Sequence, residues 1–243
     1  MAEILAKNQL NRELVVTHID LSGLKPVAKK GFIDLLTKSS ESSNKPKSDV
    51  CIFTIDNVCT PEECAELIEL SEKEGVYEQA LINVGGGEQR LMSNIRNNTR
   101  YMRDDKQLAS MLWSRIKHLV PSTWSKDKFP SVGLNERLRF LRYDPGEWFK
   151  PHQDGNYQQP DGSETSFVTI QLFLNEGFVG GETTFLDFTG VKKVKVVPKT
   201  GSVLVFEHQL CHEGSELISG RKYVIRTDVM YKTDKYRKSI DNY

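Results

Sequence analysis

The spacing of hydrophobic positions changes near the middle of the chain, from helical periodicity to short strand-like runs. Val50–Ile55 is rich in β-branched residues and predicts a strand. Thr60–Glu63 then has the form of a capping box with proline at the first helical position, and Gly75 marks the end of the predicted helix. The apolar positions of this helix fall on one stripe, formed by Cys64, Leu67 and Ile68.

A second helix is predicted from about Asp104 to Leu119, because apolar residues recur there at helical spacing and Pro121 follows. Each of the two helices has a single apolar stripe, so we interpret both as braces packed against a core. Between them, Gly85–Gly87 form a loop that we interpret as a mobile lid over a pocket. No Gly-Lys-Ser/Thr follows these glycines, which argues against a phosphate-binding loop.

From Leu138 onward the sequence consists of short strand-like runs separated by turn signals such as Pro145-Gly146. The predicted strands are Leu138–Tyr143, Phe167–Leu174, Thr183–Leu186, Lys192–Val197, Ser202–Phe206 and Lys222–Tyr231. Many short strands with regular turns are typical of a sandwich or jelly roll. The expected fold is therefore α+β, with an all-β core braced by N-terminal helices. The expected regions are a tail with a polar linker (1–48), a support region (49–130) and the core (131–243).

Composition narrows the classes of protein to which the chain can belong. Its 33 basic and 33 acidic residues balance, so no overall field favours nucleic acid as a partner. Met1–Leu14 lacks the apolar run of a secretory signal, and no segment approaches the roughly 18 apolar residues of a membrane span. The four cysteines show no C-x-x-C spacing, which favours a reducing compartment. We expect a cytoplasmic protein, with a nuclear location also open and no membrane partner.

The first candidate for chemistry is the triplet His152-Gln153-Asp154. On an extended segment, residues two apart project to the same face, so His152 and Asp154 can offer nitrogen and oxygen to one metal ion. The triplet alone is a weak signal. It becomes specific if a second histidine completes a 2-His-1-carboxylate triad, and both His208 and His212 follow a predicted strand.

The last predicted strand carries charges on one face. Lys222, Arg226 and Asp228 are separated by even numbers of residues, so their side chains share a face in an extended segment. Cations on the inner face of a barrel need a reason, because an unpaired buried charge is very costly. One such reason is an anionic ligand inside the barrel.

Four segments, in this order, resemble the catalytic domain of the Fe(II)/2-oxoglutarate-dependent dioxygenases, and the most similar branch is the prolyl 4-hydroxylase-like one. They are Leu141–Asp154, Gly180–Phe185, Pro198–Phe206 and His212–Tyr223. The resemblance implies a double-stranded β-helix, the jelly-roll core of that family. It also implies that iron is bound by three residues, namely His152, Asp154 and His212.

The same resemblance implies a site for the co-substrate. Lys222 would pair with the distal carboxylate of 2-oxoglutarate, and Tyr143 and Thr169 would form hydrogen bonds to the co-substrate. His212 is preferred to His208 as the iron ligand, because Glu-Gly follows it and Lys222 stands ten residues later. His208 is then expected to be a surface histidine or one that supports the iron ligands.

The resemblance implies hydroxylation of a carbon centre, with O2 as the second co-substrate and decarboxylation of 2-oxoglutarate to succinate and CO2. Ascorbate is an expected cofactor. Asp154 favours hydroxylation, or a desaturation or demethylation that begins with the same step, over halogenation, since halogenating members carry a small residue at this position. The leading substrate is a prolyl residue of a protein. The alternative is a free amino acid, another small metabolite or a non-prolyl residue of a protein. A silent binding module with the same fold is a further alternative.

Two parts of the chain bear on the substrate or depart from the family pattern. Arg96 and Asn98 lie in the segment that corresponds to the peptide-binding arginine region, and Trp148 lies near the expected mouth, so these are the candidate substrate contacts. Asp228 stands where the family usually has tryptophan. Arg226 and Asp228 are expected either to form a structural ion pair or to support the co-substrate, a water or a polar substrate group.

Overall fold

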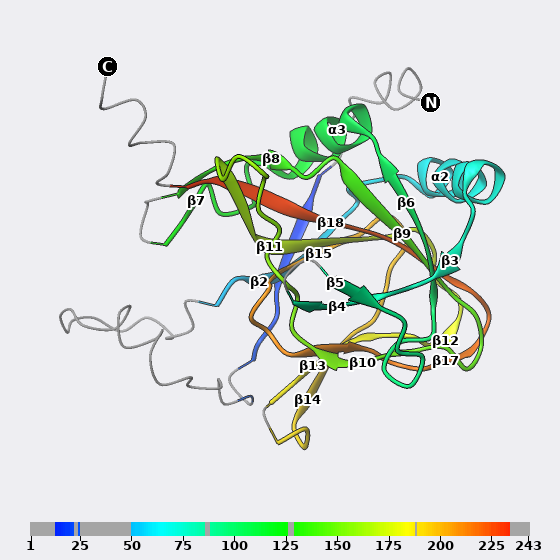
Figure 1. The fold of residues 1–243 in the computed structure, drawn as a ribbon. Coiled ribbons are helices and arrows are strands. Elements are labelled where there is room, and N and C mark those ends of the chain that lie inside the picture. Colours follow the sequence, from blue (N-terminus) through cyan, green and yellow to red (C-terminus); the bar gives the residue numbers. More distant parts are fainter. Residues whose placement is uncertain are drawn as a thin grey trace, which may run out of the picture.

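Two antiparallel sheets form the body of the protein, with two helices on the outer side of the larger one (Figure 1). The computed structural model describes residues 13–21, 24, 50–85, 88–125, 129–187 and 189–233. The two helices in this part of the chain are α2 (Pro61–Glu74) and α3 (Lys106–Ile116). Neither of them is both long and apolar enough to cross a membrane.

The larger sheet has ten strands, eight of which follow one another in a continuous path. That path is β1 (Val15–His18), β2 (Ile52–Asp56), β15 (Val203–Glu207), β11 (Glu164–Phe173), β18 (Lys222–Lys232), β9 (Arg137–Tyr143), β6 (Thr99–Asp104) and β3 (Glu78–Gln79). The other two are β8 (Phe129–Leu134), which pairs with β18, and β7 (Thr123–Trp124), which pairs with β8.

The smaller sheet has four strands in the order β10 (Phe149–His152), β16 (His212–Gly214), β13 (Thr183–Leu186) and β14 (Lys193–Val196). Two strand pairs lie outside both sheets: β12 (Val179–Gly180) with β17 (Leu217–Ser219), and β4 (Ile82–Gly85) with β5 (Glu88–Arg90). The site described below lies between the two sheets, because its residues come from facing strands of both.

Alternation along the strands of the larger sheet separates two cores. In β18, Tyr223 and Ile225 point to the side that also holds Leu67 of α2 and Leu112 of α3. Val224 points to the opposite side, where it belongs to a second cluster with residues of the smaller sheet such as Phe185. Both faces of the larger sheet are therefore buried, which explains why its central strands read as nearly continuous apolar runs.

Several predicted elements agree closely with the structure. The first helix has the full capping box, since the Thr60 hydroxyl accepts from the amide of Glu63 and the Glu63 carboxylate accepts from the amide of Thr60. Gly75 ends this helix, in an extended conformation rather than a left-handed one. A side chain at this position would collide with the carbonyl of Ser71 and the ring of Tyr101. Thr183–Leu186 is a strand with the predicted bounds.

Other expectations need correction. The second helix is shorter than predicted, because Asp104 still belongs to β6 and Asp105 caps the helix through its side chain. Part of the expected tail is a strand, since Val15–His18 pairs with β2 at the edge of the larger sheet. The polar linker at 39–48 lies outside the described residues. The expected lid loop is flanked by the paired strands β4 and β5, and Gly86 and Gly87 lie outside the described residues.

The N-terminus of α2 offers a test of how the helix is anchored. The Glu63 carboxylate is buried and forms two bonds with the guanidinium of Arg115, at 2.9 and 2.8 Å, in addition to its capping bond. We expect Thr60→Ala to lower the free energy of unfolding by about 1 kcal/mol. Glu63→Ala should lower it by about 3–5 kcal/mol, because it also breaks a buried ion pair.

Urea unfolding at equilibrium measures both changes. Glu69→Ala is the matched control, because Glu69 is exposed on the same helix, and its effect should stay within about 0.5 kcal/mol. Equal losses for Thr60→Ala and Glu63→Ala would contradict an anchoring role for the pair between Glu63 and Arg115.

Candidate metal and co-substrate site

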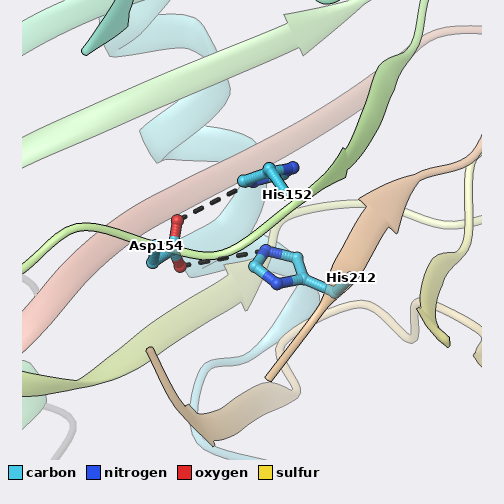
Figure 2. A group of neighbouring side chains, drawn as sticks. All are labelled: His152, Asp154 and His212. Carbon is cyan, nitrogen blue, oxygen red and sulfur yellow. Dashed lines mark ion pairs between the residues drawn. The ribbon is translucent and has the colours of Figure 1, made fainter. Parts of the chain in front are cut away.

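Three side chains meet at the edge of the smaller sheet next to β11, as Figure 2 shows. His152 ends β10 and His212 begins β16, and antiparallel pairing places these two residues directly opposite each other. The carboxylate of Asp154 lies beside both rings, and each of its oxygens is 3.8 Å from the Nε2 atom of one histidine (Figure 2). One donor atom from each residue falls within 4.8 Å of the others, so the three can surround a single metal ion.

Hydrogen bonds behind the rings prepare both histidines as metal ligands. The Nδ1 atom of His152 lies 2.8 Å from the carbonyl of Lys150, and that of His212 lies 2.9 Å from the carbonyl of Leu210. A carbonyl only accepts, so Nδ1 carries the proton and Nε2 presents its lone pair to the centre. Burial lowers the pKa of His152 to about 3 and also lowers the pKa of His212, which keeps both rings neutral.

Asp154 is held as an ionised carboxylate. Its backbone amide donates to the carbonyl of His208, at 3.0 Å, and this bond fixes the chain just after the H-x-D triplet. The hydroxyl of Thr169 donates to one carboxylate oxygen at 2.6 Å, and Arg226 lies 3.2 Å from the other. Burial alone would raise the pKa of this carboxyl, but the positive charge of the adjacent Arg226 outweighs burial and holds the pKa well below its usual range.

A pocket opens beside the three residues, lined by His152, Asp154, His212, Arg96, Arg139, Leu141, Tyr143, Phe149, Gln171, Thr183, Gly214, Lys222, Val224 and Arg226. Lys222 is 3% exposed, and its ammonium donates to the carbonyl of Gly181 at 2.5 Å. No carboxylate of the described residues lies within ion-pair distance of this ammonium. Burial lowers the pKa of Lys222 to about 8, although Glu182 opposes the shift. Such a cation is suited to an anionic ligand.

The structure also places the other predicted co-substrate contacts. Tyr143 lines the pocket, and the ammonium of Lys222 lies 5.1 Å from the centre of its ring. Thr169 is fully buried and its hydroxyl is directed at Asp154, so a direct bond to the co-substrate stays a prediction. Gln171 and Thr183, which our sequence analysis missed, line the pocket and bond to each other at 2.9 Å. Gln171 could have been found, because it follows Thr169 by two residues on the same face of β11.

The three candidate substrate contacts occupy different positions. Arg96 lines the pocket, and its guanidinium lies 4.4 Å from the centre of the Phe149 ring. Asn98 is fully buried and accepts a bond from Nε of Arg96 at 2.7 Å, so it orients the arginine and does not face the pocket. Trp148 is half-buried and is not among the residues that line the pocket. Of the three, only Arg96 is placed to meet a substrate inside the pocket.

Arg226 and Asp228 form the expected ion pair, at 3.1 Å, and the pair belongs to a larger network. Asp228 also lies 3.2 Å from Arg139 and 3.4 Å from Nε2 of His208. His208 is fully buried, which rules out the surface position that we considered for it. Because Arg226 contacts Asp154 as well, the network connects His208 to the carboxylate of the candidate triad.

Residues 138–227 match the family model described as the 2OG-Fe(II) oxygenase superfamily. This match agrees with the resemblance found in the sequence. A probable prolyl 4-hydroxylase, number 11 of Arabidopsis thaliana, is 35% identical over 74 residues, which are 29% of this chain and 24% of the relative. The chain thus matches about a quarter of the length of this relative.

Two solved prolyl hydroxylases are similar in structure. The enzyme of Trichoplax adhaerens, solved with a peptide fragment of the oxygen degradation domain of hypoxia inducible factor, has a TM-score of 0.57 at 18% identity, over 76% of this chain and 84% of that one. The Pseudomonas putida prolyl-4-hydroxylase has a TM-score of 0.51 at 18% identity, over 74% of this chain and 93% of that one. At these identities the likeness establishes a shared fold, and it confirms the expected jelly-roll core.

Metal titration distinguishes the two histidines that could complete the triad. We expect His212→Ala to weaken Mn(II) binding by more than about 100-fold, because it removes a donor from the centre. His208→Gln should keep affinity within about tenfold, since His208 acts only through Asp228 and the backbone of Asp154. Isothermal titration calorimetry measures both affinities, and a greater loss for His208→Gln than for His212→Ala would overturn the assignment.

Proposed function

We propose that this protein is an Fe(II)- and 2-oxoglutarate-dependent dioxygenase that hydroxylates a carbon centre. The observation that carries the proposal is the joint presence of a 2-His-1-carboxylate set and a buried lysine without a carboxylate partner in one pocket of the described structure. Two neutral imidazoles and one carboxylate leave half of an octahedral coordination sphere open, and this donor set suits Fe(II). The bound iron would supply the oxygen chemistry, coupled to conversion of 2-oxoglutarate into succinate and CO2.

The protein's own residues would bind and orient the reactants. His152, Asp154 and His212 would hold the metal, with their rings and carboxylate fixed by the bonds to Lys150, Leu210 and Thr169. Lys222, which lies next to Tyr143 in the pocket, would pair with the distal carboxylate of 2-oxoglutarate.

Charge determines how 2-oxoglutarate would be oriented in the pocket. Apolar side chains surround the metal ligands, because Phe185 of the smaller sheet and Phe206 of the larger sheet pack on the ring of His212. In such surroundings an ion pair is stronger than in water, so Lys222 can fix the orientation of a dicarboxylate. The walls also exclude water from the carbon to be oxidised.

As substrate we propose a prolyl residue of a protein. Support comes from the prolyl hydroxylases among the similar proteins, one of which was solved with a peptide. The presence of all three metal donors and of Lys222 argues against a silent binding module. A free amino acid or small metabolite is the second candidate, because the pocket around Arg96 is closely lined by charged side chains. Ascorbate stays a prediction from the resemblance.

Succinate formation tests the proposed reaction. We expect the protein with Fe(II), O2 and 2-oxoglutarate to release succinate, and Asp154→Ala to reduce the rate by more than about 100-fold because it removes a metal donor. Asp161→Ala is the matched control, since Asp161 is an exposed carboxylate on a nearby loop. Equal turnover by the wild type and Asp154→Ala would rule out the triad. Mass spectrometry of peptide and amino-acid pools would identify a product heavier by one oxygen atom.

The pKa of Lys222 gives the reaction a specific pH dependence. The ammonium is charged below its pKa of about 8 and loses its proton as the pH rises through that value. We therefore expect the KM for 2-oxoglutarate to be constant up to neutral pH and to rise about tenfold per pH unit above pH 8. Initial rates across pH measure this slope.

Lys222→Arg is the control for this slope, because a guanidinium stays charged throughout the same range. Its KM for 2-oxoglutarate should show no rise above pH 8, whatever its value at neutral pH. A wild-type KM that is flat with pH would contradict the role of Lys222 as the carboxylate partner.

A further inference from the structure

Arg96 is a second buried cation of the pocket that has no carboxylate partner. It is 8% exposed, and among the described residues no carboxylate oxygen lies within ion-pair distance of its guanidinium. Its Nε donates to the amide oxygen of Asn98 at 2.7 Å, and one terminal nitrogen lies 3.5 Å from the carbonyl of Leu81. Neutral acceptors such as these compensate poorly for the loss of water around a full charge.

The nearby charges do not supply the missing anion. Four cationic side chains line the pocket, Arg96, Arg139, Lys222 and Arg226, whereas the carboxylates that face them are two, Asp154 and Asp228. Arg139 and Arg226 share those two carboxylates between them. Glu182 forms an ion pair with Lys195, and Glu147 accepts from the amide of Asp144, so neither is placed on Arg96.

The bound reactants of the proposed reaction leave the excess of positive charge in place. A divalent metal ion and the dianion of 2-oxoglutarate cancel each other, so four cations still stand against two carboxylates. Burial lowers the pKa of Arg96 to about 10, which leaves the guanidinium charged at neutral pH. An anion is therefore still missing when metal and co-substrate are present.

The position of Arg96 ties the missing anion to the metal site. Its guanidinium lies over the Phe149 ring, and that ring stacks on the imidazole of His152 at 3.5 Å between centres. Arg96 also forms a backbone bridge with Phe149, so its segment is fixed against β10. An anion bound to Arg96 would lie one side chain away from a metal ligand, where the substrate must come.

We propose that the molecule oxidised by this protein carries a carboxylate that pairs with Arg96. The inference rests on the proposed function, because the charge balance includes the metal ion and 2-oxoglutarate. The carboxylate belongs either to an acidic residue beside the oxidised position of a peptide or to the α-carboxyl group of a free amino acid. Both sources present the same chemistry to the guanidinium, which suits a bidentate pair.

The test compares acidic probes with their neutral counterparts in a binding experiment. The immobilised full-length protein, loaded with Mn(II) and 2-oxoglutarate without O2, is exposed to a random peptide pool and to the same pool with its carboxylates converted to amides. Free amino acids and their amides form the second pair of arms, which distinguishes the two sources. In one of these two pairs, the protein should retain at least ten times more of the acidic form than of the amide form. A tenfold difference in affinity is equivalent to about 1.4 kcal/mol.

Variants decide whether Arg96 causes the preference. Arg96→Gln should reduce the ratio to about one, and Arg96→Lys should keep part of it. Arg90→Gln, an exposed arginine on β5, is the control and should leave the ratio unchanged. Equal retention of both forms, no retention of either, or an unchanged ratio in Arg96→Gln would overturn the inference. Substrate-free conversion of 2-oxoglutarate to succinate tests the proposed function separately, so the two failures are distinguishable.

Discussion

The site depends on the antiparallel pairing of two short strands, β10 and β16, which places His152 opposite His212. These residues are sixty positions apart in sequence, and neither is part of a long strand. The pairing is secured by β13, which bonds to the other edge of β16 and packs Phe185 against the His212 ring. Asp154 then needs only the bond from its amide to the carbonyl of His208 to reach the centre.

Alternation along the strands of the larger sheet decides how charge is distributed inside the barrel. The strands of the larger sheet alternate between an apolar side facing the helices and a side facing the pocket, and β18 places Lys222, Arg226 and Asp228 on the latter. Buried charges are tolerated where each has a partner, and Asp228 has three partners: Arg226, Arg139 and His208. Lys222 and Arg96 have none among the described carboxylates, so their charge is available to ligands.

Local sequence signals predicted the parts of the fold that depend on local interactions. The capping box at Thr60 and the β-branched runs of the core strands identify their elements without tertiary information, as the agreement for Thr183–Leu186 shows. The short strands β10 and β16 carry almost no local signal, because their pairing is fixed by contacts between distant segments. The start of α3 was misplaced for a similar reason: Asp104 pairs across to β9, which extends the strand where helical periodicity had begun.

In the candidate site, too, some residues could be predicted from sequence motifs and others could not. Its metal donors and Lys222 could be named from motif order, but the roles of their neighbours depend on which atoms meet in space. Asn98 was expected to touch the substrate, yet it is buried behind Arg96, and Thr169 bonds to Asp154 through a hydroxyl whose direction no pattern reveals. Both cases have one cause: each side chain is buried, and its hydrogen bonds are satisfied by neighbours that only the folded chain brings together.

The cations without carboxylate partners, Lys222 and Arg96, affect both the stability of the fold and the binding of ligands. In the absence of ligands, Lys222 and Arg96 destabilise the folded state, because each loses water and gains only neutral acceptors. The two apolar clusters on either side of the larger sheet must offset this cost. An anion that binds at Lys222 or Arg96 therefore stabilises the folded state, since it binds the native site and not the unfolded chain. The same positive charges also favour anions over neutral ligands at this site. Affinity for anions is thus built into the packing of the barrel rather than added at its surface.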